Sequence, residues 1–295
     1  MIDRNYFEKI SRLRLAVSKK STSVMQGARK SLAKGSSAEF SDFREYMQGD
    51  DIRRIDWNAY GRTERLFVKE YVEERESSIS ILIDTSASMF YGEPMKNELA
   101  EELAAALSYI GLSGNDHVYL YDMKNMDKPV SLSGGVKAFK RGRAFLENLR
   151  FSGNTSIWPA VRRMQRHGSG LTIIISDLMD EGLVIDENRQ DNLEKIFKYL
   201  AYCRQNIVLI HVLDKTEAYP EFLGTHNLID MENEKSRVRV TMDNRTVDEY
   251  KKTFKAFTDS LEKTARRYRA VYAKAFTDKK FERIIFEDLR EIYDI

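Results

Sequence analysis

The sequence predicts an α/β protein whose mostly parallel central sheet is covered by helices on both faces. From residue 77 onward, short apolar runs alternate with segments of helical periodicity, which is typical of a parallel sheet. Hydrophobic residues make up 42% of the 295 residues, so a sizeable core can be buried. Since no run approaches the ~20 apolar residues of a membrane-spanning helix, and the N-terminus lacks a signal-peptide pattern, we expect a soluble, cytoplasmic protein.

The strands are predicted from runs that are apolar throughout, because parallel strands buried on both faces lack the usual polar alternation. These runs are Ser78–Asp84, His117–Tyr121, Leu171–Asp177, Ile207–Leu213 and Ala270–Ala275. A hairpin insertion near residues 226–243 is predicted from two further runs, Asn227–Asp230 and Val238–Met242, which can pair across a polar turn.

The helices are predicted from apolar residues three and four positions apart, as at Leu99, Leu103 and Leu107. The ranges with this spacing or helix-compatible composition are Lys96–Gly111, Val136–Leu149, Ile157–His167, Asn192–Gln205, Glu249–Tyr268 and Phe281–Ile292. Helices and strands alternate along residues 77–295, which we therefore interpret as one α/β domain.

Residues 1–36 form a basic extension ahead of this domain, and residues 37–76 a separate N-terminal segment. The extension carries nine lysines and arginines against Asp3 and Glu8, a net charge of +7. Its apolar spacing predicts an amphipathic helix over residues 5–18, through Phe7, Ile10, Leu13 and Val17. We expect this helix to dock on the rest of the protein. Binding to an anionic surface, such as peripheral contact with a membrane, remains an alternative.

The composition excludes several classes of protein. The net charge is only +2, so the whole chain is not expected to coat a nucleic acid. The single cysteine, Cys203, rules out a disulfide framework within the chain and fits a reducing compartment. One cysteine and four histidines also leave no structural zinc site.

Oxygen-bearing side chains follow two predicted strands and precede one helix. Asp84, Ser86 and Ser88 form a D-x-S-x-S run at the end of the first apolar strand, and Asp177 ends the third. Thr155 lies between them in a glycine-led loop. Ligands of such sheets bind at the carboxyl ends of the strands, and two carboxylates with three hydroxyls suit Mg²⁺ or Mn²⁺. D-x-S-x-S alone is also compatible with an ordinary turn, so the prediction depends on all three elements occurring in order.

This arrangement resembles the metal-ion-dependent adhesion site of von Willebrand A domains. The resemblance implies a Rossmann-like fold and an ion, Mg²⁺ or alternatively Mn²⁺ or Ca²⁺, bound by the hydroxyls of Ser86, Ser88 and Thr155. It implies that Asp84 and Asp177 supply the carboxylates. A carboxylate of a partner protein would complete the coordination, so we expect a protein-interaction module and not an enzyme.

The run Gly49–Trp57, GDDIRRIDW, precedes an acidic stretch and then the D-x-S-x-S strand. This order resembles a bacterial family catalogued as domain of unknown function 58, over roughly residues 35–290. The resemblance implies an adaptor or chaperone-like role with a MoxR-type AAA+ ATPase or its client as partner. Some members carry two membrane helices ahead of this region, so we expect the present chain to be a soluble short form. The charged residues of the run, Asp50, Asp51, Asp56, Arg53 and Arg54, are interpreted as an ion-pair network.

Two other functions remain open. A metal-dependent phosphohydrolase needs an activated water and usually a nearby base. The histidines are poor candidates for that base, because two lie inside predicted strands, His117 and His211, and two lie away from the motif, His167 and His226. A binder of anionic surfaces could use residues 1–36, and its binding would then depend strongly on salt.

Overall fold

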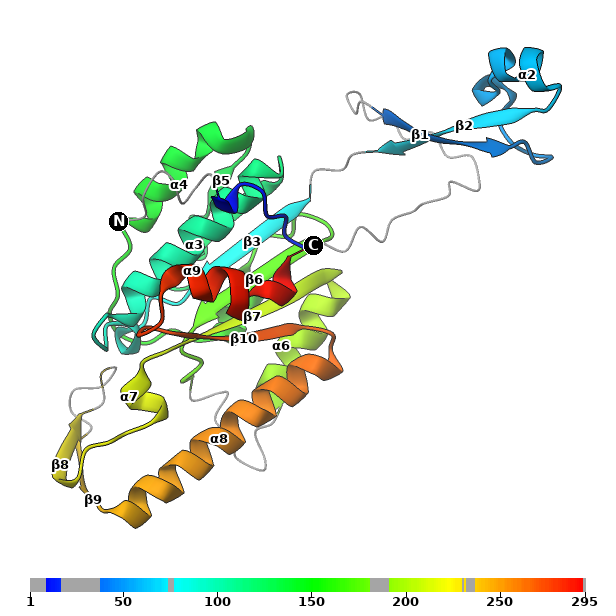
Figure 1. Cartoon of the computed structure of the whole chain (residues 1–295). Coiled ribbons are helices and arrows are strands. Elements are labelled where there is room, and N and C mark those ends of the chain that lie inside the picture. Colours follow the sequence, from blue (N-terminus) through cyan, green and yellow to red (C-terminus); the bar gives the residue numbers. More distant parts are fainter. Residues whose placement is uncertain are drawn as a thin grey trace. The chain divides into compact units, whose positions relative to one another are not determined.

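The computed structural model describes residues 9–16, 38–73, 77–180, 191–229, 231 and 237–293 (Figure 1). The chain divides into two compact units. The larger unit contains residues 1–19 and 77–295, and the smaller contains residues 20–76. No helix among the described residues is long and apolar enough to cross a membrane.

Within the described part of the larger unit, a six-stranded sheet has the order β10-β7-β6-β3-β4-β5. All neighbouring pairs are parallel except β4 and β5. In chain order the strands are β3 (Ser78–Ile83), β4 (His117–Asp122), β5 (Val130–Leu132), β6 (Gly170–Ser176), β7 (Gln205–Leu213) and β10 (Val271–Phe276). The predicted Rossmann-like α/β class, with a mostly parallel sheet, is confirmed.

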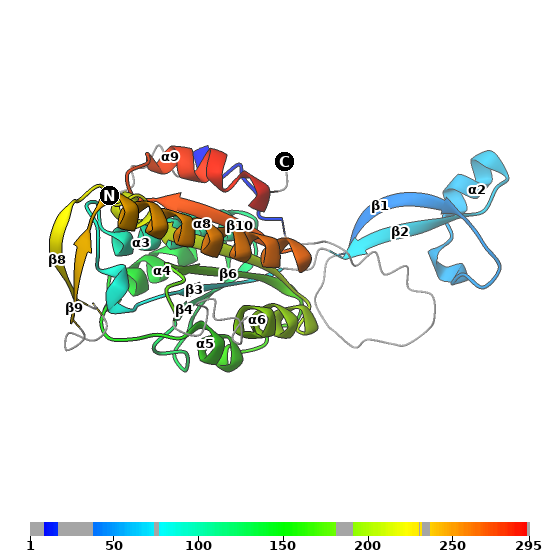
Figure 2. The ribbon, with the colours of Figure 1, turned by 90° about the horizontal axis from the view of Figure 1, so that it is seen from below.

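Helices cover both faces of this sheet (Figure 2). One face packs against α3 (Lys96–Ser113), α4 (Phe139–Leu146) and the C-terminal turns that begin with α9 (Phe281–Arg283). The other packs against α5 (Ile157–Arg163), α6 (Asp191–Tyr202) and α8 (Asn244–Arg267). The central strands β3 and β6 are buried at every position, as expected for strands covered on both sides.

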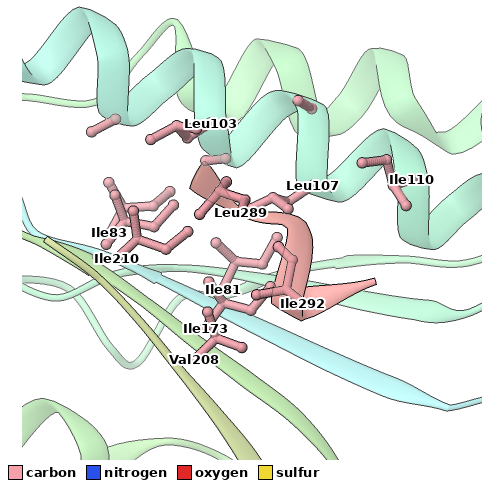
Figure 3. Packing of buried hydrophobic residues seen from close by; sticks show 14 of the residues in the cluster. Ile81, Ile83, Leu103, Leu107, Ile110, Ile173, Val208, Ile210, Leu289 and Ile292 are labelled. Atoms are coloured by element: carbon pink, nitrogen blue, oxygen red, sulfur yellow. The ribbon is translucent and has the colours of Figure 1, made fainter. Parts of the chain in front are cut away.

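The core of the first face is built almost entirely from aliphatic side chains (Figure 3). Helix α3 contributes one row and the strands another, and the C-terminal turns close the cluster. The residues labelled in Figure 3 are Ile81, Ile83, Leu103, Leu107, Ile110, Ile173, Val208, Ile210, Leu289 and Ile292. This packing holds β3, β6 and α3 in a fixed relation, which matters because the candidate site lies where they meet.

Residues 9–16 pack on this same face but are mostly not helical, and the rest of the helix predicted over residues 5–18 lies outside the described residues. Only residues 9–10 of the described stretch 9–16 are helical. Leu15 forms an antiparallel bridge with Tyr293, and the Ala16 N–H donates to the carbonyl of Ile292 at 2.8 Å. Pairing with the C-terminal end thus satisfies the backbone groups that a continued helix would have used. Ile10 and Leu15 are buried in the core of the first face.

Other predicted elements are found with altered bounds. The hairpin consists of β8 (Gly224–Ile229) and β9 (Arg237–Met242), which pair antiparallel as predicted. Helix α8 begins five residues before the predicted start, because the Asp243 side chain caps it by accepting the Thr246 N–H at 2.7 Å. The last predicted helix is instead divided into three short turns, α9, η4 (Ile284–Asp288) and η5 (Arg290–Ile292). The short helix α7 (Lys215–Ala218) was not predicted.

The smaller unit is a hairpin of β1 (Ala38–Glu45) and β2 (Phe67–Glu73) with η1 (Ile52–Arg54) and α2 (Trp57–Thr63) between the strands. The acidic residues of the GDDIRRIDW run serve this local structure. The carboxylate of Asp50 accepts two hydrogen bonds from Arg44, one from each terminal guanidinium nitrogen, both at 2.9 Å. The prediction did not include this pairing. Asp51 caps η1 and Asp56 caps α2 through backbone N–H groups.

Candidate functional site

The candidate site lies where β3 and β6 end side by side. These strands are parallel neighbours, and Ile83 pairs with Ile175 in the register. The backbone N–H of Asp84 donates to the carbonyl of Ile175 at 2.9 Å. The residues that follow the two strands, Asp84 and Asp177, are thereby brought to one edge of the sheet, and both are almost completely buried.

The carboxylate of Asp84 is held by three donors. One oxygen accepts the Ser86 N–H at 2.9 Å and the Thr155 hydroxyl at 2.5 Å, and the other accepts the Ser176 hydroxyl at 2.5 Å. Burial and the charge of Asp177 raise the pKa of Asp84, although these hydrogen bonds oppose the rise. Asp84 is therefore a fixed, poorly solvated carboxylate that a nearby cation would stabilise.

Two backbone hydrogen bonds bring the loop with Thr155 against the D-x-S-x-S turn. The Ala87 N–H donates to the carbonyl of Gly153 at 2.8 Å, and the Ser152 N–H donates to the carbonyl of Thr85 at 3.0 Å. The hydroxyl of Thr85 in turn donates to Asp122, the last residue of β4, at 2.6 Å. Thr85 thus points away from the candidate ligands and ties the turn to the neighbouring strand.

The remaining contacts join the five predicted residues into one chain. The hydroxyl oxygens of Ser86 and Ser88 are 2.9 Å apart, and the hydroxyl of Ser88 lies near enough to Asp177 to help lower the pKa of that carboxyl. The structure therefore brings all five together in the order Thr155, Asp84, Ser86, Ser88 and Asp177. Adjacent ligands of an octahedral Mg²⁺, bound at 2.0–2.1 Å, lie about 2.9 Å apart. The donor chemistry and the spacing of the two serine oxygens thus fit a hard divalent ion.

The depth of these side chains differs in a way that bears on access. Asp84, Ser86 and Asp177 are 4%, 2% and 2% exposed, whereas Ser88 and Thr155 are partly exposed. The carboxylates therefore lie at the bottom of the site and two hydroxyls lie at its rim. Among the described residues, no group of three or more histidine, cysteine or acidic side chains is placed to hold a metal. The candidate site is not a group of that kind, because it has only two acidic side chains, Asp84 and Asp177, and its other oxygens belong to hydroxyls.

A buried lysine, which sequence reasoning missed, borders this site. Lys96 is the first residue of α3 and is 0% exposed. Its ammonium lies 2.9 Å from an oxygen of Asp177 and 2.6 Å from an oxygen of Glu217. Burial alone would lower the pKa of Lys96, but the charges of the two carboxylates raise it, so the lysine is charged. No local pattern identifies this residue, since a lysine at the start of a helix is usually exposed.

Glu217 reaches Lys96 from α7, a helix of four residues. A capping box orients it: the Asp214 side chain accepts the Thr216 N–H at 2.8 Å, and the other oxygen of Glu217 accepts the Asp214 N–H at 3.0 Å. The hydroxyl of Tyr250 also donates to the carbonyl of Glu217 at 2.7 Å. Hydrogen bonds therefore fix both the side chain and the backbone of Glu217.

The histidines are used for packing in the described structure. His211 lies on β7 with 0% exposure, and its Nδ1 is 2.7 Å from the hydroxyl of Tyr272. Burial lowers the pKa of His211 to about 3, so its ring is neutral at ordinary pH. His117 and His167 stack on Tyr119.

The solved structures that are similar to this chain include two bacterial proteins of low sequence identity. The conserved hypothetical protein BatB of Bacteroides thetaiotaomicron matches 73% of this chain and 98% of its own, with 16% identity and a TM-score of 0.42. An aerotolerance-related membrane protein of Bacteroides fragilis, carrying multiple mutations to serine, matches 73% and 99%, with 15% identity and a TM-score of 0.40.

Sequence comparison identified the family. Uncharacterized proteins of Mycobacterium bovis and Mycobacterium tuberculosis are 32% identical over 108 residues, which are 36% of this chain. The match spans 34% of the length of those relatives. The family model described as protein of unknown function DUF58 matches residues 42–259, well over half of the chain. The chain therefore belongs to the family of unknown function DUF58.

Proposed function

We propose that this protein is a Mg²⁺-dependent protein-interaction module that binds an acidic side chain of a partner. The observation that carries the proposal is the contact chain of Thr155, Asp84, Ser86, Ser88 and Asp177 at the ends of β3 and β6. These residues match the adhesion site of von Willebrand A domains in type and order. Mn²⁺ or Ca²⁺ could take the place of Mg²⁺, since all the donors are oxygens.

The proposed chemistry follows from the charge of the donors. Three of them, Ser86, Ser88 and Thr155, are neutral hydroxyls, which bind an ion without reducing its charge. An ion held in this way stays electrophilic and would accept a further carboxylate as a ligand. The hydroxyls of Ser88 and Thr155 are partly exposed, which supports the proposal because a partner's carboxylate could approach an ion held there from solvent.

We propose binding and not catalysis, because metal-assisted hydrolysis usually employs a base close to the metal-bound water. Within the described residues, no histidine ring is hydrogen-bonded to a side-chain oxygen of the five. The neutral, fully buried His211 is also unsuited to exchange protons with solvent.

The partner we propose is a MoxR-type AAA+ ATPase or a client of that ATPase, as the DUF58 resemblance implies. A cytoplasmic location is part of the proposal, since the single cysteine fits a reducing compartment. We expect the ATPase to bind the protein in the presence of Mg²⁺ and to be released by a chelator.

Metal binding by a double variant tests the proposal. Calorimetric titration with Mn²⁺ is expected to detect one site in the wild type, and at least a tenfold loss of affinity in Ser86→Ala/Ser88→Ala. The two hydroxyls are hydrogen-bonded to each other, so removing both at once does not leave one of them without this hydrogen-bond partner. Ser131→Ala, which removes a hydroxyl that contacts His117, is the matched control and should bind Mn²⁺ normally. Equal Mn²⁺ affinity in the wild type and the double variant would refute the proposed site.

A further inference from the structure

The buried ammonium of Lys96 has no role in the five-residue site described so far, although it touches one of the five. Lysine is almost never fully buried unless it is paired, and here it contacts two carboxylates, Asp177 at 2.9 Å and Glu217 at 2.6 Å. Such an arrangement costs desolvation energy that a neutral, apolar packing would avoid.

The surroundings hold the ammonium in place. The Lys96 N–H donates to the carbonyl of Tyr91 at 2.9 Å, and the ring of Tyr91 lies 5.7 Å from the ammonium. The hydroxyl of Tyr91 reaches Thr216 on α7 at 3.1 Å. Tyr91, α7 and the start of α3 thus enclose the charge, so that solvent can screen it only weakly.

The charges at this end of the sheet are unequal. Two buried carboxylates here, Asp122 and Asp214, have hydroxyl and backbone donors of their own. The other three, Asp84, Asp177 and Glu217, accompany a single ammonium, that of Lys96, which contacts the last two. The remaining two negative charges match a divalent ion. Without Lys96, the site with a divalent ion bound (the loaded site) would carry a net negative charge and would repel an acidic side chain. With Lys96 the loaded site is neutral, and the approaching carboxylate meets the ion and a nearby second cation.

We propose that Lys96 and Glu217 set the balance at this site between holding the divalent ion and accepting the carboxylate of a partner. Lys96 repels the ion and attracts the carboxylate, whereas Glu217 does the reverse. This inference rests on the proposed metal-dependent binding and adds the residues that determine its specificity. The reason is Coulombic: the ammonium of Lys96 contacts Asp177 of the site, and Glu217 contacts that ammonium. Interactions between charges this close are strong in a poorly solvated interior.

Two variants test the inference through effects of opposite sign. Lys96→Met removes the positive charge but keeps an unbranched side chain, and Glu217→Gln removes the negative charge and keeps the shape. Mn²⁺ affinity is measured by electron paramagnetic resonance. Acetate binding to the Mn²⁺-loaded protein is measured by the fall in water-proton relaxation as acetate displaces metal-bound water. We expect Lys96→Met to bind Mn²⁺ at least tenfold more tightly and acetate at least threefold more weakly.

Glu217→Gln is expected to bind Mn²⁺ at least tenfold more weakly and, once loaded, acetate at least threefold more tightly. A purely structural role would weaken both ligands in both variants. Lys198→Met, which removes one of the two partners of Glu194 on α6, is the control for a change of one charge and should leave both affinities unchanged. If Lys96→Met folds only with Mn²⁺, its melting temperature should rise more steeply with Mn²⁺ concentration than that of the wild type.

The outcomes separate this inference from the proposed function. Failure of the wild type to bind Mn²⁺ at all would overturn both. Wild-type binding that is lost in Ser86→Ala/Ser88→Ala, together with parallel changes for Mn²⁺ and acetate in Glu217→Gln, would overturn the role of Lys96 and Glu217 alone.

Discussion

Asp84 and Asp177 show how two residues of one type acquire different properties within a single site. Burial and the charge of Asp177 raise the pKa of Asp84. Burial acts to raise the pKa of Asp177 too, but the charge and hydrogen bond of Lys96, together with the Met179 N–H and the Ser88 hydroxyl, lower it overall. The negative charge of Asp177 is therefore already balanced by an ammonium, and the charged form of Asp84 is the one that a further cation would stabilise most. The sequence predicts both aspartates as ligands of one kind, and the difference between them depends on a lysine 81 positions away from Asp177 in the chain.

Glu101 on α3 provides a prediction at this same scale. Burial, followed by the charges of Glu98, Glu147 and Glu102, raises its pKa from 4.5 to about 7. The folded protein therefore holds this proton more tightly than the unfolded chain. The stabilisation is present below pH 4.5 and is lost as the pH rises to about 7. Glu101→Gln is expected to melt at a higher temperature than the wild type at pH 8 and at the same temperature at pH 4.

Differential scanning calorimetry across this pH range measures the effect. The control is Glu249→Gln, which alters an exposed glutamate paired with Arg245 and should not raise the melting temperature at pH 8. An increase of equal size at pH 4 and pH 8 would show that Glu101 acts through packing and not through its charge.

At the scale of the elements, the sheet depends on a close approach of two strands. β6 begins at Gly170, which pairs with Ser78 on β3. A Cβ at this glycine would lie 2.1 Å from the carbonyl oxygen of Ser78 and 2.4 Å from its hydroxyl. These contacts are far below van der Waals distance, and the first involves backbone that cannot rotate away. The same two strands carry Asp84 and Asp177 at their other ends, so their register also determines the site.

Gly170→Ala is therefore expected to lower the free energy of unfolding by about 3 kcal/mol or more, at the upper end of the range for overpacked positions. Urea unfolding followed by circular dichroism measures the change. Gly61→Ala is the control, because a Cβ there meets no atom within 4 Å, and alanine is favoured over glycine by roughly 1 kcal/mol within a helix. Equal stability of Gly170→Ala and the wild type would mean that the strands can separate without cost.

Periodicity predicted long elements better than short ones. The buried runs of β3, β6 and β7 were found close to their predicted bounds, because a strand covered on both faces is apolar throughout. The elements it missed, among them β5, α7 and α2, span three to seven residues. At that length there are too few positions for a period to appear. Missing α7 had the largest consequence, since it carries Glu217.

At the scale of the whole molecule, the two ends of the larger unit are packed together. Ile10 is 0% exposed within the core of the first face, and Leu15 pairs with Tyr293 beside it. The basic charge of residues 1–36 suggested a possible surface binder, yet apolar residues of this stretch are part of the core. Residues 9–16, the described part of this stretch, therefore contribute to the stability of the α/β unit.

Ile10→Ala is expected to destabilise the larger unit by about 2–5 kcal/mol, the usual cost of truncating a buried isoleucine to alanine. Thermal unfolding should show a lowered melting temperature. Lys9→Ala is the control, because the side chain of Lys9, next to Ile10 in the chain, is exposed. Surface substitutions usually change stability by no more than ~0.5 kcal/mol. Identical melting of Ile10→Ala and the wild type would place the N-terminal segment outside the cooperative unit.

The sequence by itself determined the α/β class, the main strands and the five residues of the candidate site. The class and the strands follow from apolar runs within short stretches, and the five residues follow from three separate elements that occur in the order of a known site. Only the tertiary structure decided that Lys96 and Glu217 border the site and that Leu15 pairs with Tyr293. Those contacts join residues 81 to 278 positions apart. Nothing local marks them, since their free energy comes from burial and charge pairing that exist only after the chain has folded.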